Sequence, residues 1–463
     1  MERANEVAVA VGRCPGPTVQ DIYDGDAVPP PDVLRHEAPP RPMSDADLPA
    51  DRYWSRDWHD REVRAVWERC WQVAARLEQL AEVGDHVVYD IARHSLIVVR
   101  TGPGPTEVAA YVNSCLHRGT LLRTEPGNAT RFRCPFHGYT WDLAGELVAV
   151  PAEWDFPHVR PEEFCLPRAH VAFWGGFVFV NLADEPEPFE DYLEILPEHF
   201  APFPLEDRYL AAHVAKVMPC NWKLAQEAFI ESYHIPVAHA QTAAYVGDLN
   251  TQYDVYPGVR HVNRMITCEG VPSPSLRDVP PQETVRRMQR DLPFHSGKPI
   301  EVGPDDNPRT LLAERARRKI GAAAGRDLSA VSDAEVLDAI EYFLFPNLVP
   351  WAGHGVPIAY RFRPNGDDPE SSIMEIMLLF AKAADGSHPP AAPCTWLTVD
   401  QSWQEAPELG GAGFIVDQDT DNLRRIQRGL RASRKGAVTL GRYQESRIRH
   451  FHETLDHYVA RFG

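Results

Sequence analysis

The chain has 463 residues, which exceeds one compact core and corresponds to about two or three domains. Its formal net charge of −19 and isoelectric point near 5.4 lack the basic surface that nucleic acids and anionic membranes require, so we expect neither as a partner. The first 20 residues carry Glu2, Arg3 and Glu6 beside a short apolar run. This pattern predicts no signal peptide and no spanning helix, and it favours a cytoplasmic location.

The N-terminal segment is rich in proline, with nine prolines in the first fifty residues. They predict a Pro-rich arm over residues 1–45 that either wraps a neighbouring chain or lacks regular structure. Residues 46–84 form a predicted helical lead-in that reaches Leu77, because Val63, Val66 and Trp67 recur at helical spacing between charges.

A small all-β domain is predicted over residues 85–185. The runs HVVYDI, SLIVVRT, EVAAYVN and WGGFVFVNLA are rich in β-branched and aromatic residues and are separated by Gly, Pro or polar turns. The shorter runs RFRCPF and ELVAVPA follow the same logic. Apart from Cys115 and Cys134, the cysteines lack the spacing of a disulfide framework, so we expect them to be reduced thiols.

Inside this domain lies Cys115-Leu-His117, and fourteen residues after its Arg-Gly comes Cys134-Pro-Phe-His137. Two thiolates and two imidazoles are enough to close a tetrahedral zinc site or an iron–sulfur cluster. Zinc fingers usually place a Cys pair before a His pair, whereas each loop here mixes the two. A Rieske [2Fe–2S] centre needs that mixture, because two Cys hold one iron and two His hold the other.

The second half, residues 186–463, opens with a strand-like run that reaches Met218 and a helix that Asn221 caps. We expect Glu231 and His234 to share one face of this helix. His239 is five positions beyond His234, so it would point away on an ideal helix. Pro236 lies between the two histidines and can break the helix, which would turn His239 back toward His234.

A pair of histidines needs a carboxylate to complete a 2-His-1-carboxylate site for non-haem Fe(II). Asp417, Asp419 and Asp421 alternate in the downstream segment GGAGFIVDQDTDNLRRIQRGL. Acids at this place also suit the N-terminus of a helix, and we assign the capping role to Thr420 or Asp421.

Together these motifs resemble the catalytic alpha subunit of Rieske-type ring-hydroxylating oxygenases. The likeness rests on CLHRGTLL, CPFHGYTWDLAGEL, NWKLAQEAFIESYHIPVAH and VDQD followed by IQRGL. It implies a helix-grip catalytic domain, a curved antiparallel sheet around a long helix, to which the runs AYRFRP and IMEIMLLFAK would belong. The resulting α+β fold combines that domain with a small all-β Rieske [2Fe–2S] domain.

The resemblance also implies roles for individual residues. Many relatives have Asp where this chain has Glu231 and Asn where it has Ala228, so the surroundings of the iron differ. The implied cluster ligands are Cys115, His117, Cys134 and His137, the implied ligands of one Fe(II) are His234, His239 and Asp419, and the implied acid that bridges two subunits is Glu231.

Function follows from the two metal sites. The chain shows no Gly-rich dinucleotide fingerprint and no second Cys-rich pattern, so electrons of NAD(P)H must arrive through a separate reductase, with or without a ferredoxin. The resemblance implies a homotrimer, with or without a β subunit, that uses O₂ to hydroxylate a small apolar or aromatic substrate by inserting either one oxygen atom or both. The alternative is a Rieske electron carrier or redox sensor. Phe343, Phe345 and Trp351 either line the pocket or belong to the core.

Overall fold

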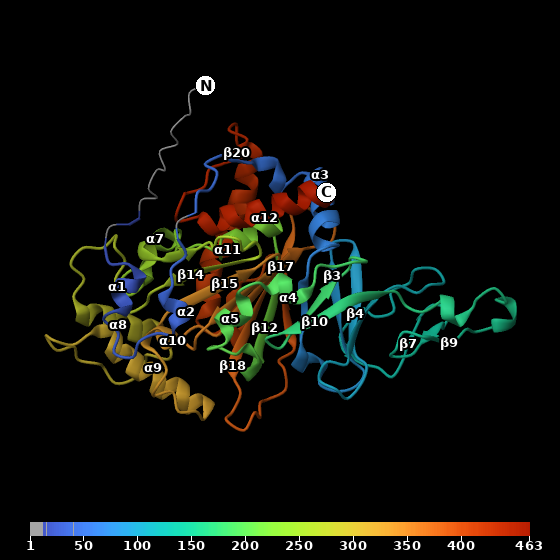
Figure 1. Ribbon diagram of the computed structural model, residues 1–463, viewed down its shortest axis with the longest axis horizontal. Helices are drawn as coiled ribbons and strands as arrows, with labels where there is room; N and C mark the ends of the chain where they lie inside the picture. The colour runs from blue at the N-terminus through green and yellow to red at the C-terminus, as the bar shows by residue number, and fades with distance from the viewer. Residues whose placement is uncertain (1–12, 15, 40) are drawn as a thin grey trace.

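Two large β-sheets share one hydrophobic core, and a smaller lobe projects from one of them (Figure 1). The computed structural model describes residues 13–14, 16–39 and 41–463. The α+β class expected from the sequence is confirmed by this mixture of largely antiparallel sheets and separate helices. Among the described residues, none of the helices is both long and apolar enough to span a bilayer.

The larger sheet has eight strands, and all neighbouring pairs are antiparallel except β12 and β19. It curves around helices α12 and α6, as the sequence analysis expected for the catalytic domain, and β14 and β15 are buried along their whole length. In spatial order the strands are β13 (Gln252–Asp254), β14 (Val262–Thr267), β15 (Ala339–Leu344), β16 (Leu348–Ala352), β17 (Ile358–Pro364), β18 (Ser372–Ala381), β12 (Arg208–Met218) and β19 (Cys394–Leu397).

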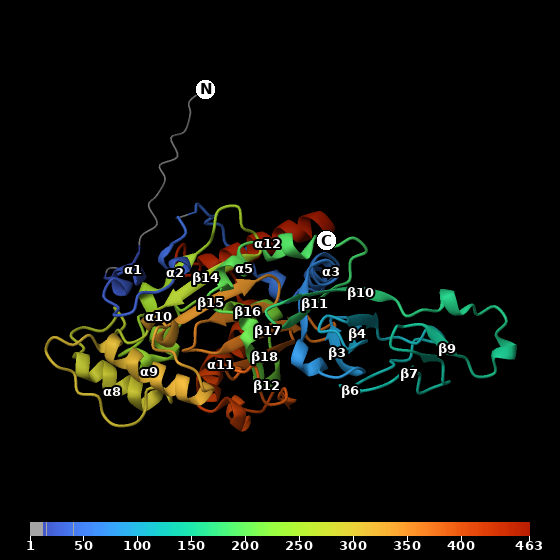
Figure 2. The ribbon, with the colours of Figure 1, turned by 60° about the horizontal axis from the view of Figure 1, so that its bottom comes forward.

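The second sheet has seven strands and leads into the projecting lobe. We use that name for residues 113–166, which lie at the opposite end of the molecule from α8 and α9 in both ribbon views (Figures 1 and 2). The sheet order is β2 (Gln72–Arg76), β11 (Phe177–Asn181), β10 (Arg168–Trp174), β5 (Val108–Val112), β4 (His94–Arg100), β3 (Asp85–Ile91) and β6 (Gly127–Asn128), and the lobe adds β7 (Phe132–Arg133), β8 (Thr140–Trp141) and β9 (Leu147–Ala149).

Helices surround the eight-stranded sheet. The last one, α12, ends beside α3, so the C-terminal end of the chain lies against the lead-in. The α-helices are α1 (Val19–Tyr23), α2 (Asp32–Arg35), α3 (Arg56–Glu62), α4 (Phe189–Leu193), α5 (Leu196–Phe200), α6 (Trp222–Glu227), α7 (Ile235–Ala238), α8 (Pro281–Asp291), α9 (Pro308–Ala324), α10 (Asp333–Leu337), α11 (Ala412–Ala432) and α12 (Ser446–Phe462), and a two-stranded pair joins β1 (Leu48–Pro49) to β20 (Ala437–Val438).

Part of the predicted lead-in is wrong. Helical structure covers α3 and the following turn Val63–Trp67, but residues 72–76 form strand β2 instead of a helix. All five residues of β2 are buried and β2 pairs with β11. Because even Gln72 and Arg76 at the two ends of this run are buried, it has no exposed face to reveal its period, and pairing with β11 decides its conformation.

The N-terminal arm lies on its own chain where it is described. Residues 1–12, 15 and 40 fall outside the described residues, and the remainder contains the two short helices α1 and α2, which the prolines did not lead us to expect. Tyr23 and Leu34 are buried in the main core. Asp26 pairs with buried Arg309 at 2.8 Å, and the Ala38 N–H donates to Asp254 at 2.7 Å.

Helix α6 is held by a buried polar network. The predicted cap at Asn221 is confirmed, since its side chain accepts from the Lys223 N–H at 3.1 Å. At the other end, Glu227 accepts from Tyr53 Oη at 3.1 Å and lies 2.8 Å from His452 Nε2. Burial raises the pKa of Glu227 to about 8. The lead-in and α12 therefore both fix the position of α6.

The helix that was expected to carry Glu231 and His234 ends too early to do so. It stops at Glu227, and the next helix, α7, starts at Ile235, so both residues lie in the connection. Side chains satisfy the backbone there: the Ser232 N–H donates to Tyr253 Oη at 3.0 Å and the His234 N–H to Glu231 Oε2 at 3.1 Å. Pro236 therefore opens α7 and does not interrupt α6.

Candidate metal centres

The two Cys/His loops of the projecting lobe have the same backbone hydrogen-bond pattern. The Cys115 N–H donates to the Thr120 carbonyl and the Gly119 N–H to the Cys115 carbonyl, both at 2.8 Å. In the second loop the N–H groups of Cys134 and Gly138 make the equivalent bonds at 2.8 and 3.1 Å. Both glycines adopt φ +79°, a conformation that side chains disfavour. The fixed Gly four residues after each Cys is therefore part of the loop geometry.

Within these loops the cysteines face inward and the histidines face outward. Cys115 and Cys134 are each 3% exposed, whereas His137 is exposed and His117 partly so. The two imidazole rings lie 4.7 Å apart between centroids, and His117 stacks on Tyr139 at 4.9 Å. The two predicted imidazole ligands thus lie side by side and nearer the surface than the two cysteines.

In the catalytic part, His234, His239 and Asp419 converge although they come from segments far apart in the sequence. The Nε2 atoms of His234 and His239 lie 3.3 and 2.7 Å from Asp419 Oδ1, and the three candidate donor atoms fall within 4.8 Å of one another. Among described residues this is the group of His, Cys, Asp and Glu side chains with the geometry to hold one ion. The Asp419 side chain is only 6% exposed.

The electrostatics of this triad suit a divalent cation. Burial acts to lower the pKa of His234, but the neighbouring carboxylates of Asp419 and Glu231 outweigh burial and raise that pKa to about 10. Burial acts to raise the pKa of Asp419, but the neighbouring imidazoles of His234 and His239 outweigh burial and lower it. Two carboxylates thus place enough negative charge at one point to hold a proton on His234, a proton that a metal would replace.

Two further side chains contact the imidazoles from outside the triad. Glu231 Oε1 lies 2.7 Å from His234 Nδ1, and Gln418 Oε1 lies 3.0 Å from His239 Nδ1. Both contacts leave the Nε2 atoms directed at Asp419. The sequence analysis singled out Glu231 but missed Gln418, for which the only available signal was its position next to Asp419.

The three alternating acids have different places on α11. This helix starts at Ala412, so the predicted capping role of Thr420 or Asp421 is wrong, and Asp419 lies within the helix rather than before it. Thr420 is buried and accepts from Trp403 Nε1 at 3.2 Å. Asp417 accepts from the Trp403 N–H at 2.9 Å, and Asp421 is exposed. A helical period turns only Asp419 of the three toward the histidines.

Comparison with known proteins identifies the two parts of the chain. Residues 204–461 match the family described as ring hydroxylating alpha subunit (catalytic domain), and residues 70–160 match the Rieske [2Fe-2S] domain. The first match covers more than half of the sequence. The chain belongs to the ring-hydroxylating alpha subunit family. Membership implies a [2Fe–2S] cluster and a non-haem Fe(II) in each chain.

Individual relatives of this ring-hydroxylating alpha subunit cover two kinds of oxygenase. The chain is 32% identical over 189 residues to the alpha subunit of chlorobenzene dioxygenase from Cupriavidus sp., which is 39% of this chain and 42% of that protein. It is 31% identical over 217 residues to the oxygenase subunit of glycine betaine monooxygenase from Chromohalobacter salexigens, 45% of this chain and 46% of that protein. The alignments thus span about half the length of these relatives.

Solved structures agree on the fold. A quaternary ammonium Rieske monooxygenase that oxidises carnitine in gut microbiota superposes with a TM-score of 0.63 at 16% identity, covering 89% of this chain and 95% of that one. Naphthalene 1,2-dioxygenase from Rhodococcus sp. superposes with a TM-score of 0.60 at 20% identity, covering 90% and 95%. At these identities the likeness extends to the fold only.

The residues present in this alpha subunit fit the two groups that the family implies. Two buried thiols and two outward imidazoles supply the S₂ and N₂ donors of a Rieske cluster. His234, His239 and Asp419 supply two imidazoles and one carboxylate. Asp419 Oδ1 is buried and accepts no hydrogen bond among the described residues, so a cation bound beside it would satisfy its charge.

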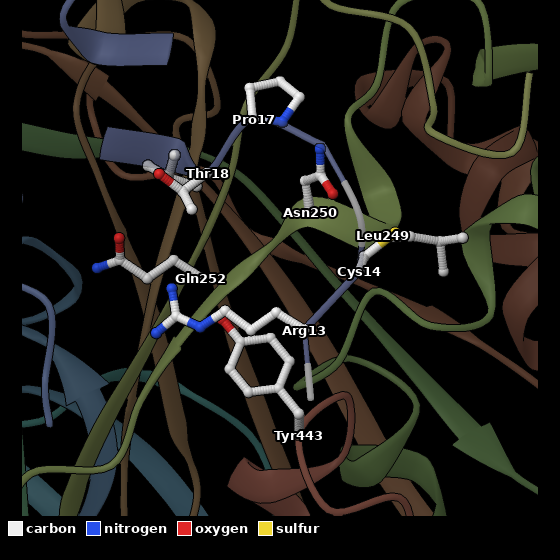
Figure 3. A pocket seen from close by; sticks show the side chains of 9 residues that line it. Arg13, Cys14, Pro17, Thr18, Leu249, Asn250, Gln252 and Tyr443 are labelled. Carbon is white, nitrogen blue, oxygen red and sulfur yellow. The ribbon is translucent and has the colours of Figure 1, made fainter. Parts of the chain in front are cut away.

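A pocket elsewhere on the surface does not belong to this centre. It lies where the arm meets residues 249–252 and Tyr443, with the Arg13 guanidinium over the Tyr443 ring at 5.4 Å (Figure 3). None of the predicted metal ligands lines it. The sequence analysis offered two roles for three aromatic residues, either lining a pocket or packing in the core. Phe343 and Phe345 are buried against Phe451, whereas Trp351 is partly exposed.

The first prediction concerns the projecting lobe. Cys134→Ser should abolish the visible absorption of the cluster, because it removes a thiolate donor, while the catalytic fold persists on its separate core. Cys165→Ser, at an exposed thiol of the same lobe, is the matched control and should keep the absorption. A Cys134→Ser protein that retains the cluster spectrum would refute the ligand assignment.

The second prediction separates the three acids of α11. Asp419→Ala should lose mononuclear iron, measured by metal analysis after chelation and reloading, and should keep the Rieske EPR signal. Asp421→Ala should retain iron because Asp421 is exposed, and Asp417→Ala should retain iron while destabilising the turn at Trp403. Loss of iron in Asp417→Ala but not in Asp419→Ala would show that the assigned register is wrong by two residues.

Proposed function

We propose that this chain is the terminal oxygenase component of a Rieske non-haem iron system, which hydroxylates a small organic substrate with O₂. The observation that carries this proposal is the convergence of His234, His239 and Asp419 in a chain that also presents two Cys/His loops. An electron carrier or redox sensor would need the loops but not the triad. We therefore prefer the oxygenase to that alternative.

In this proposal Cys115, His117, Cys134 and His137 hold the cluster, and the triad holds the iron. Bound Fe(II) supplies open coordination positions for O₂ beside the substrate. The protein's own part is to orient the donors: Glu231 fixes His234 through its Nδ1, so that Nε2 faces the site. Burial of Asp419 keeps solvent from competing for the carboxylate.

Electrons should come from a separate NAD(P)H-dependent reductase, with or without a ferredoxin between them. The sequence lacks a dinucleotide fingerprint and a second Cys-rich pattern, so the chain has no site of its own to collect these electrons. A cytoplasmic location is consistent with Cys70, Cys220 and Cys268, which remain free thiols in the core.

We further propose a head-to-tail trimer in which electrons cross between subunits. The lobe with the Cys/His loops lies well away from α11 in both ribbon views, so one chain does not bring its own two centres together (Figures 1 and 2). Apolar side chains are exposed at both ends, Phe136 and Trp154 on the lobe and Tyr233 and Val237 beside the triad. A head-to-tail contact between such ends gives a closed ring of three when successive subunits are related by a third of a turn.

Glu231 is the residue that would join the two centres in this trimer. It is partly exposed, and it already contacts His234 through both carboxylate oxygens. A carboxylate has about four acceptor sites, so Glu231 can accept a further bond from His137 of the partner subunit. Whether a β subunit joins the ring is a separate matter, which the composition of the purified complex decides.

The third prediction tests transfer between subunits. Cys134→Ser lacks the cluster and Asp419→Ala lacks the iron, so each variant should be inactive alone. Mixed trimers prepared under conditions of subunit exchange should recover part of the activity, because an intact lobe then faces an intact triad at some interfaces. Each variant exchanged with itself is the control. Mixed trimers that form, as shown by mass spectrometry, yet remain inactive would place the transfer within one chain.

Aromatic rings near the triad support an apolar or aromatic substrate. Phe229 packs against Tyr360 at 5.1 Å, and Tyr360 packs against Trp351 at 6.1 Å. Phe229 lies in the connection after α6 that also carries His234, so these rings belong to the same region of the chain as the triad. Flat hydrocarbon substrates would stack on such rings.

One observation favours a second substrate class, a small molecule with a positively charged head. Glu341 lies opposite Trp351 on the paired strands β15 and β16, and the charges of Glu231 and His234 act on it. Its Oε1 pairs with Arg447 at 2.7 Å, but its buried Oε2 has no partner among the described residues. Aromatic faces together with an unpaired carboxylate oxygen are the elements of a cation site.

The fourth prediction distinguishes the two substrate classes by calorimetry. If the cation site is correct, choline should bind about tenfold or more tightly than its uncharged isostere 3,3-dimethylbutan-1-ol. Glu341→Gln should remove this preference, whereas Glu269→Gln, at another buried carboxyl with a raised pKa, should keep it. Binding of toluene without binding of choline would instead support the hydrocarbon substrate.

A further inference from the structure

Gln418 is placed to control one of the two iron-binding histidines. Its Oε1 lies 3.0 Å from His239 Nδ1 and also accepts from Gln241 Nε2 at 2.6 Å. In return, Gln418 Nε2 donates to Gln241 Oε1 at 3.4 Å. The two amides therefore form a reciprocal pair, and one carbonyl of that pair faces the imidazole.

This arrangement selects one tautomer of His239. A carbonyl oxygen can only accept, so the hydrogen of a neutral His239 must sit on Nδ1. Nε2 then keeps its lone pair, and this atom is the one that lies 2.7 Å from Asp419 Oδ1. An imidazole that is to bind a metal through Nε2 needs this tautomer.

Gln241 restricts rotation of the Gln418 amide and so supports this tautomer of His239. An isolated Gln418 amide could rotate and present its NH₂ group to His239, which would favour the opposite tautomer. Because Gln241 Nε2 donates to the same oxygen, rotation of Gln418 alone would bring NH₂ groups against each other. The contact between α11 and residue 241, just after α7, thus opposes rotation of the Gln418 amide by itself.

We propose that Gln418 is a positioning residue that sets the tautomer and direction of His239 for metal binding, with Gln241 holding Gln418 in place. This inference rests on the proposed function, in which His239 binds iron. The two imidazoles then differ in the hydrogen-bond acceptor at Nδ1, which is the carboxylate of Glu231 for His234 and the neutral amide of Gln418 for His239. The stronger acceptor makes His234 the more strongly donating ligand.

The experiment measures Fe(II) affinity without turnover, by anaerobic titration of metal-depleted full-length protein against a chromophoric chelator. Gln418→Leu removes the acceptor at similar size and should weaken Fe(II) binding by about 10- to 100-fold. Gln418→Glu restores an acceptor and should recover most of the affinity. Gln241→Leu should cost roughly twofold to tenfold, the effect of one neutral hydrogen bond. Asn422→Leu, one turn along α11 and exposed, is the control.

A second readout separates positioning from a general structural role. Thermal unfolding of the metal-free variants reports the stability that the amide pair gives to the fold, and the visible spectrum of the Co(II)-loaded protein reports the donor geometry. Positioning predicts an altered Co(II) spectrum in Gln418→Leu with little change in the metal-free melting temperature. A structural role predicts the reverse.

Several outcomes would overturn the inference. One is Fe(II) affinity within twofold of wild type in Gln418→Leu, and another is failure of Gln418→Glu to recover any of the loss. If Gln418→Leu does not fold, Gln241→Leu decides, and unchanged affinity in that variant refutes the proposal. Failure of the proposed function looks different, because wild type and Asp419→Ala would then bind Fe(II) equally.

Discussion

The constraint on which this structure depends is the convergence of two imidazoles and a buried carboxylate from distant segments. At these distances the three groups interact strongly, and their positions must be fixed by other side chains. For the two imidazoles, the fixing contacts are made at the ring nitrogen that faces away from Asp419. Glu231 holds His234 and Gln418 holds His239. The break between α6 and α7 is part of the same requirement, because a continuous helix would point residues 234 and 239 in different directions.

Sequence reasoning succeeded where the determinant was local. The spacing within each Cys/His loop and the cap at Asn221 involve residues within five positions of one another, so the motifs show them directly. The fold class followed from the strand runs and from the family resemblance, and the structure bears it out. The ligand set could be named as a hypothesis because the family resemblance supplied what spacing alone left open.

Long-range determinants were beyond sequence reasoning. Gln418 acts on His239 across 179 positions, and nothing near Gln418 in the chain marks that contact. The true start of α11 was hidden because its N-cap residue, Gly411, makes no side-chain cap hydrogen bond, whereas Thr420 and Asp421 are residue types that commonly cap a helix. Strand β2 owes its conformation to β11, about a hundred residues later, and not to its own composition.

The shared core has a consequence for how the protein unfolds. Residues of both large sheets, together with Tyr23 and Leu34 of the arm and Leu455 of α12, belong to one continuous apolar cluster. The projecting lobe belongs to a second, smaller cluster around Phe132 and Trp141, whose buried members in the seven-stranded sheet are Ile97, Val99 and Tyr111. Cooperativity follows contiguous packing, so the arm, both sheets and α12 should melt as one unit. The lobe is the part that can open independently, and loss of its cluster need not spread to the rest of the molecule.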